Sequence, residues 1–376
     1  MLEFLWDKSE KKVEYIELIY DLIFVYLVSR NVSLLHTIED GFITISAFLT
    51  YIASSLAILQ IWYFSTLFIN RYGCGSVRDH LGLFLNMFLL YHMADGIRAD
   101  WGAYYYRYNM SWALILLNLA LQYGLHLRQC GGVPWERKHI HYHMGILLIT
   151  AAIVLISIPI YLFTGAALAP WAVVFGLFAP ILTRHVDALV PVDFSHLSER
   201  VMLYVVFTFG EMILGITGYF SSGFSLWSLY YSLMAFLIVA GLFTGYGYFY
   251  DHLLDREIVT TGTGYMLLHI VLILALNNIP AALEFMRELK VHLIPKTAFL
   301  VVSMLVYFLC LLLTQRYAVK HIGDRRFYSR MIGSFILYAL LVAVFYRVSQ
   351  VSIALTVVFI FLQLFALRHA GVEKEA

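Results

Sequence analysis

Charged residues are scarce in this chain of 376 amino acids. Asp, Glu, Lys and Arg make up 13% of it, whereas they make up about 25% of an average soluble domain. The longest polar interruptions, residues 98–110 and 128–143, are too short to enclose a hydrophobic core of their own. The shortage of charge therefore excludes a sizeable soluble domain.

Cysteine is also scarce, and the common catalytic motifs are absent. The three cysteines, Cys74, Cys130 and Cys310, form no CxxC pair, so we expect free thiols. The sequence contains no P-loop, no GxGxxG after a strand, no HExxH and no GxSxG. Its basic residues form no cluster of the kind that binds nucleic acid. These absences argue against ATP-driven transport and nucleic-acid binding, and we expect neither a cofactor nor a bound metal.

Long apolar runs, in contrast, recur along the whole chain. Runs of about 18 residues or more are typical of helices that cross a bilayer. We therefore predict an all-α polytopic membrane protein. The sequence indicates about twelve transmembrane helices, at residues 15–35, 43–69, 80–98, 109–127, 143–163, 167–183, 198–219, 226–250, 262–285, 295–317, 329–346 and 349–369.

The positions of Lys and Arg predict the orientation of these helices. Most of the basic residues fall in loops on the same side of the membrane as the amino terminus. Because cytoplasmic loops carry the excess of positive charge, we predict that both termini lie in the cytoplasm.

The two halves of the chain resemble each other at a spacing near 183 residues. Polar positions match across this spacing: Glu17 with Glu199, Asn86 with His269, and Asp95 with Asn278. An even number of spans per repeat produces parallel repeats, related by an axis along the membrane normal. We predict two parallel six-helix halves, residues 1–190 and 191–376.

Acidic residues mark the first predicted helix. Glu14, Glu17 and Asp21 are spaced i, i+3 and i+7, so their side chains share one face. Carboxylates inside a bilayer cost several kcal/mol unless they face protein, water or a cation. We expect this face to point inward.

The seventh predicted helix supplies further charges. Glu199 and Arg200 lie at its cytoplasmic end, and Glu211 lies twelve residues deeper, about 18 Å along the helix axis. Two interpretations stay open for the charges near the cytoplasmic end: a functional pathway, or a static ion pair of Arg200 with Glu17 or Asp21. For Glu211 the depth in the membrane favours a functional role.

Polar residues of the third and ninth predicted helices complete the set. His269 is suited to proton exchange near neutral pH. Asparagines such as Asn86 more often bridge helices through hydrogen bonds than line a pathway.

Histidines cluster before the fifth predicted helix. His139 and His143 would share a helix face, as two zinc ligands do. Without a nearby cysteine or carboxylate pair, we favour an interfacial histidine cluster and no metal site. Asp187, Asp193 and His196 fall in a predicted cytoplasmic loop, where they could gate a pore or simply be solvated.

Two motifs resemble those of a bacterial family, the low temperature requirement A (LtrA) proteins. Residues 13–25 resemble its opening V-x-x-x-E-L-F-F-D-L-x-F-V, with Ile19 and Tyr20 in place of the two Phe. Residues 196–211 resemble its H-x-x-E-R…L-G-E segment, with Phe209 in place of Leu. Similar elements also fall at 70–72, 251–252 and 269–284. The resemblance implies a multi-pass protein of the bacterial inner membrane, linked by family name to growth in the cold.

Our first hypothesis is a transporter or channel that moves protons, cations or a small solute through the bilayer. Its pathway candidates are the intramembrane polar residues Glu17, Asp21, Glu199, Arg200, Glu211, His269, Asn86 and Asp95.

The second hypothesis is an intramembrane enzyme acting on lipid, with residues 17, 21, 196, 199 and 200 as acid, base and phosphate clamp. Because that group has no recognisable nucleophile, we favour a protein that is not an enzyme. The third is a sensor of membrane state. The expected partners are the lipid bilayer and a small ion or solute.

Overall fold

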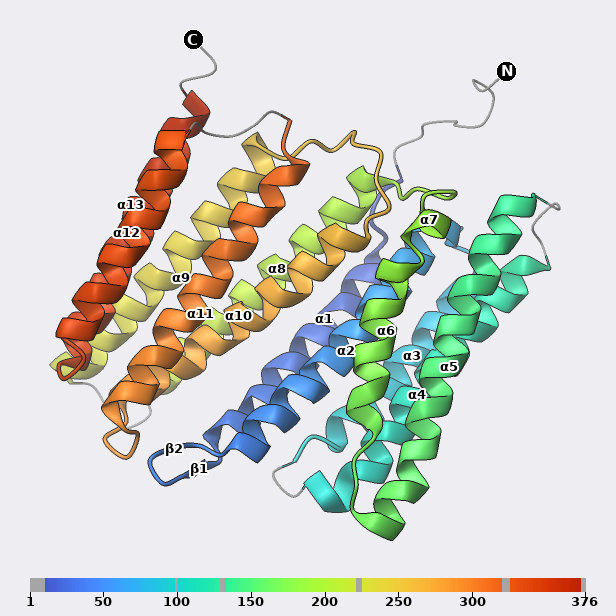
Figure 1. Ribbon diagram of the computed structural model, residues 1–376, viewed down its shortest axis with the longest axis horizontal. Coiled ribbons are helices and arrows are strands. Elements are labelled where there is room, and N and C mark those ends of the chain that lie inside the picture. Colours follow the sequence, from blue (N-terminus) through green and yellow to red (C-terminus); the bar gives the residue numbers. More distant parts are fainter. Residues whose placement is uncertain (1–10, 99–100, 129–132, 221–224, 320–324, 373–376) are drawn as a thin grey trace. The chain divides into compact units, whose positions relative to one another are not determined.

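The computed structural model describes residues 11–98, 101–128, 133–220, 225–319 and 325–372 (Figure 1). Nearly every element in these ranges is helical. The longer helices are α1 (Tyr15–Asn31), α2 (Ile45–Tyr72), α3 (Val77–Asp95), α4 (Trp101–Leu127), α5 (Pro134–Thr164), α6 (Ala169–Leu182), α8 (Phe194–Ile216), α9 (Leu226–His252), α10 (Thr263–Arg287), α11 (Leu293–Thr314), α12 (Arg325–Val344) and α13 (Ser349–Val372). The short elements are η1 (Val32–His36), β1 (Ile38–Glu39), β2 (Phe42–Ile43), α7 (Arg184–Asp187), η2 (Thr217–Phe220) and η3 (Gln315–Tyr317).

The prediction of an all-helical membrane protein is confirmed. Each predicted span overlaps one of the longer helices, and within the described residues ten helices are long and apolar enough to cross a membrane. The two that fall outside this group are α6, which has only 14 residues, and α3, which carries charged and histidine side chains along its length. The number of spans and the cytoplasmic position of both termini stay predictions.

The helices group into two compact units, each described separately. Unit 1 comprises residues 1–31, 50–204 and 256–267, and unit 2 comprises residues 32–49, 205–255 and 268–376. In unit 1, α4 packs against both α3 and α5, and α5 against α6 (Figure 1). In unit 2, α13 packs against α9 and α12. Contacts within a chain do not test whether its halves are repeats, so the two six-helix halves also stay a prediction.

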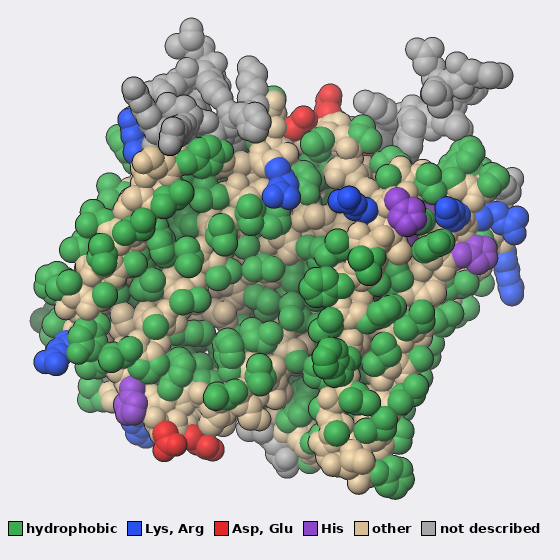
Figure 2. Space-filling view, in the orientation of Figure 1, with side chains coloured by type: hydrophobic (Ala, Val, Ile, Leu, Met, Phe, Trp, Pro, Cys, Tyr) green, Lys and Arg blue, Asp and Glu red, His purple; other side chains and the backbone are tan. Residues whose placement is uncertain are grey.

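On the face drawn in Figure 2, apolar side chains cover most of the surface, and most of the Lys, Arg and His side chains lie near its upper and lower edges. Phe84 and Phe88 of α3 and Ile156 of α5 are among the large exposed apolar residues. Soluble proteins rarely expose continuous apolar surface of this kind. The surface pattern therefore suits contact with lipid.

Local sequence explains the helices that carry the polar residues. Ser76 caps α3 by accepting from the Asp79 backbone N–H, while the Asp79 side chain accepts from the Ser76 backbone N–H. Pro134 occupies the first turn of α5, and Gly165 ends that helix with a φ of 73°, which L side chains rarely adopt. Because α5 starts at Pro134 rather than near residue 143, it includes both His139 and His143.

The hairpin of unit 2 follows a strong turn signal. β1 pairs antiparallel with β2, with Ile38 opposite Ile43, and Asp40 and Gly41 form the two-residue turn with φ values of 47° and 79°. Positive φ at both positions is the type I′ geometry that Asp-Gly favours.

A close approach between α2 and α6 provides a test of packing in unit 1. The Gln60 side-chain amide donates to the backbone carbonyls of Ala172 and Val173, and a Cβ at Gly176 would lie 2.8 Å from Gln60 Cδ. Gly176→Ala should displace the buried amide and lower the free energy of unfolding in detergent by about 1–3 kcal/mol. The matched control is Gly145→Ala, whose Cβ would meet nothing within 4 Å. Equal stability of the two variants would contradict this packing.

Candidate functional site

A fully buried ion-pair cluster lies in unit 1, where α1 and α8 meet. Arg200 of α8 donates from Nε to Asp21 Oδ2 and from Nη2 to Asp21 Oδ1, both at 2.8 Å, and from Nη1 to Glu17 Oε2 at 2.9 Å. The exposed fractions are 0% for Arg200 and Asp21 and 2% for Glu17. One guanidinium thus pairs with two carboxylates away from solvent.

Trp62 of α2 completes the environment of Asp21. Its indole Nε1–H donates to Asp21 Oδ1 at 3.0 Å, and its ring packs 4.5 Å from the ring of Tyr204. Asp21 therefore accepts three hydrogen bonds from two side chains. These bonds satisfy both oxygens of a carboxylate that has no contact with solvent.

His196 approaches the second oxygen of Glu17. Its Nε2 lies 3.4 Å from Glu17 Oε1, and its Nδ1 lies 3.0 Å from the Asn70 side-chain nitrogen. Asn70 also accepts from the Asp193 backbone N–H and donates to the Asp193 carbonyl, which fixes the orientation of its amide. Because Asn70 can only donate to Nδ1, the neutral His196 ring carries its proton on Nε2, toward Glu17.

A small pocket, lined by apolar and charged side chains, leads to the same carboxylate. Its volume is about 20 Å³, enough for a single water molecule, and its lining includes Lys11, Glu14, Glu17, Asp79 and His80. Glu14 and His80 pair at 3.1 Å, and the side chains of both are more than one-third exposed. The pocket thus joins a solvated rim to the buried Glu17.

Lys11 lines the pocket without pairing directly with Glu17. Its ammonium group donates to the backbone carbonyls of Ile69 and Gly73, at the end of α2. Burial lowers the pKa of Lys11, against the opposing pull of Glu17.

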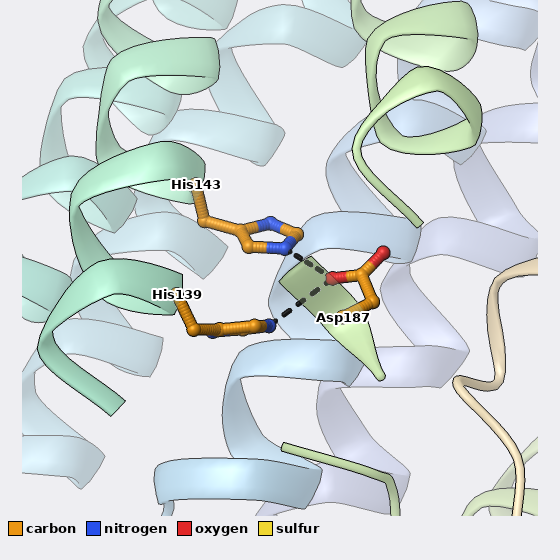
Figure 3. A group of neighbouring side chains, drawn as sticks. All are labelled: His139, His143 and Asp187. Carbon is orange, nitrogen blue, oxygen red and sulfur yellow. Dashed lines mark hydrogen bonds and ion pairs between the residues drawn. The ribbon is translucent and has the colours of Figure 1, made fainter. Parts of the chain in front are cut away.

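A second buried cluster in unit 1 centres on Asp187 of α7. Its Oδ1 lies 3.1 Å from His139 Nε2 and 2.6 Å from His143 Nε2, both on α5 (Figure 3). Arg71 Nη2 lies 3.7 Å from the same oxygen, and the Thr263 hydroxyl donates to Oδ2 at 3.2 Å. All three residues drawn in Figure 3 are buried, with exposed fractions of 0% for His139 and Asp187 and 1% for His143.

The charge state of Asp187 follows from these neighbours. Burial alone would raise the pKa of its carboxyl, but the hydrogen bonds from His139 and His143 and the charge of Arg71 outweigh it and hold the pKa well below its usual range. Asp187 is therefore ionised at neutral pH.

Three consecutive residues at the end of α2 join the two clusters. Asn70 contacts His196, Arg71 contacts Asp187, and the Tyr72 hydroxyl lies 2.7 Å from His139 Nδ1. Arg71 also donates to the carbonyls of Val190 and Thr261. The end of α2 is thus the common support of both charged groups.

The remaining predicted site residues lie in several places. Asn86 is buried and accepts from Asn118 while donating to the Tyr20 hydroxyl, as expected of a helix bridge. Asp95 is partly exposed and pairs with Arg98 and Arg107, and Glu199 is half-buried. Glu211 and His269 belong to unit 2, where Glu211 is half-buried and His269 is buried beside the Tyr246 hydroxyl.

Sequence reasoning left several of the residues in these clusters out. Trp62 and Asn70 carry no sequence signal that points to Asp21 or His196. The sequence places Asp187 in a predicted loop with no link to the histidines, whereas in the structure it is the carboxylate partner of His139 and His143. The i, i+4 spacing of His139 and His143 was the available signal, and its partner comes from 44 residues further along the chain.

Long apolar helices around buried, hydrogen-bonded charges define an integral membrane protein of the multi-pass class. The chain belongs to the family described as bacterial low temperature requirement A protein (LtrA), whose model matches residues 12–367. This confirms the resemblance of the two motifs. A comparison with curated proteins finds no match.

The ion-pair cluster makes a strong prediction for stability. Arg200→Gln would leave Glu17 and Asp21 buried side by side without their counter-ion. Removal of one partner from a buried ion pair typically costs about 3–5 kcal/mol, so the free energy of unfolding of the purified protein should fall by that amount.

The matched control is Arg98→Gln, which breaks the largely exposed pair with Asp95. Exposed pairs contribute little, so this variant should unfold like the wild type. If Arg200→Gln were as stable as Arg98→Gln, the buried pairing would be contradicted.

Proposed function

We propose that this LtrA-family protein is a transporter or channel that moves protons, a small cation or a small solute across the membrane, and that Glu17 holds the moving charge. One observation carries the proposal: Glu17 lines the water-sized pocket and also pairs with the buried Arg200. Glu17 thus belongs to the buried cluster and also faces a pocket that water can enter.

The charge of the cluster supports this role. With His196 neutral, the two carboxylates of Glu17 and Asp21 face one guanidinium, which leaves one net negative charge among the four residues. Lys11, which lines the same pocket, balances this charge only from a distance, because its ammonium group donates to backbone carbonyls. A proton or cation that enters the pocket and binds at Glu17 removes this imbalance.

The geometry also separates the roles of the two carboxylates. Asp21 receives two bonds from Arg200 and one from Trp62. Glu17 receives one bond from Arg200 and a longer one, 3.5 Å, from the Glu14 backbone N–H. When Glu17 is neutralised, Arg200 keeps its counter-ion in Asp21. Glu17 is therefore the exchangeable group, and Arg200 is the counter-ion it gains and loses.

Unit 2 holds candidates of its own, Glu211 and His269. We include both in the proposal because a titratable side chain in a long apolar helix costs free energy unless it has a function or a partner. The flux assay below tests Glu211 separately from Glu17.

The test is ion flux in liposomes that contain only the purified protein, under imposed pH, K⁺ and Na⁺ gradients. Glu17→Gln keeps the shape of the side chain but removes its charge. We expect at least about a tenfold loss of flux, since a proton or cation can no longer be held there. Glu211→Gln should show a comparable loss.

Glu39→Gln is the matched control, because Glu39 is an exposed carboxylate of the β1 strand. Its flux should equal that of the wild type. Equal flux in Glu17→Gln would remove Glu17 from the route. Absence of flux in the wild type under every gradient would contradict ion transport and favour the lipid-enzyme or sensor hypothesis.

A further inference from the structure

Three potential metal ligands converge inside unit 1, away from the proposed route. His139 and His143 are four residues apart on α5, so their rings stack on one face of the helix with centroids 4.3 Å apart. Asp187 approaches them from the one-turn helix α7 (Figure 3). The ligand atoms of all three side chains lie within 4.8 Å of one another.

We propose that His139 Nε2, His143 Nε2 and Asp187 Oδ1 bind a divalent transition-metal ion of the Zn²⁺ type. Imidazole nitrogen and carboxylate oxygen are the ligands that such ions take at about 2.0–2.2 Å. Two imidazoles and one carboxylate leave a coordination position open for water or another ligand. The inference stands apart from the transport proposal, because it uses none of the residues assigned to the route.

The surroundings of the ligands suit a metal. A histidine that binds a metal through Nε2 carries its proton on Nδ1 and donates it to an oxygen. For His139 that oxygen is in place, since the Tyr72 hydroxyl lies 2.7 Å from Nδ1. The Thr263 hydroxyl likewise holds the second oxygen of Asp187, which leaves Oδ1 facing the two rings.

The aromatic ring of Tyr123 also stacks on the imidazole of His143, with ring centroids 5.9 Å apart. This contact helps to hold the imidazole with its Nε2 toward Asp187 Oδ1.

Arg71 determines how tightly the ion is held. Its guanidinium lies 3.7 Å from Asp187 Oδ1, so it competes with a cation for the same oxygen. A dication, one carboxylate and one guanidinium together carry a surplus of positive charge. The site should therefore bind a metal that exchanges, rather than one locked in permanently as in a zinc finger.

Asp187 lies close to the protein surface, so an ion has a short path from solvent to the site. The neighbouring residues Arg184, His185 and Ala188 are exposed, so only one helical turn separates the ligands from solvent.

The test uses full-length protein without a histidine tag, stripped of metal with a chelator and then titrated with Co²⁺ and Zn²⁺. Co²⁺ bound by two imidazoles and a carboxylate in four-coordinate geometry shows strong visible absorption. We expect that absorption to saturate at one equivalent per chain and to be displaced by Zn²⁺. A wild-type titration with no saturable absorption and no stoichiometric Zn²⁺ in equilibrium dialysis would overturn the proposal without any variant.

Variants assign the ligands. His143→Gln and Asp187→Asn should each weaken Zn²⁺ binding at least about tenfold. His141→Gln is the matched control, because His141 lies on the same helix but is exposed and contacts the Arg137 carbonyl instead of Asp187. Unchanged binding in both ligand variants, or an equal loss in the control, would overturn the assignment.

Discussion

A guanidinium among apolar helices has to be surrounded by acceptors, and Arg200 imposes this constraint on unit 1. Three of its nitrogens are bound by carboxylates from the first helix, and one of those carboxylates is bound in turn by Trp62 of α2. These bonds are strongest when charged groups keep a fixed geometry away from water. The relative positions of α1, α2 and the start of α8 therefore depend on one side chain.

The end of α2 connects the ion-pair cluster around Arg200 to the second cluster around Asp187. Asn70 fixes the tautomer of His196, Arg71 balances Asp187, and Tyr72 holds His139. Because the three residues are consecutive, one helix end positions side chains of both clusters.

The helices were predictable from the sequence because long apolar runs specify them without reference to tertiary contacts. The i, i+3, i+7 spacing of Glu14, Glu17 and Asp21 also predicted an acidic face, and pairing of Arg200 with Glu17 or Asp21 was one of two open interpretations. Partners far apart in the chain were not predictable: periodicity assigns a face to His139 and His143, but nothing local says that Asp187 lies opposite. The turn at Asp40 and Gly41 was predictable from its residue types. The two short strands beside it were not, because they continue into the apolar runs on either side.

The most direct test of the central ion pair is a double-mutant cycle between Asp21→Asn and Arg200→Gln, measured as the free energy of unfolding in mixed micelles. Residues in direct contact couple by about 0.5–3 kcal/mol, and a buried bidentate pair belongs at the upper end of that range. We predict that the double variant loses less free energy of unfolding than the two single variants lose together. Losses that add to within about 0.5 kcal/mol would show that the two side chains do not interact, and would contradict the arrangement on which both clusters depend.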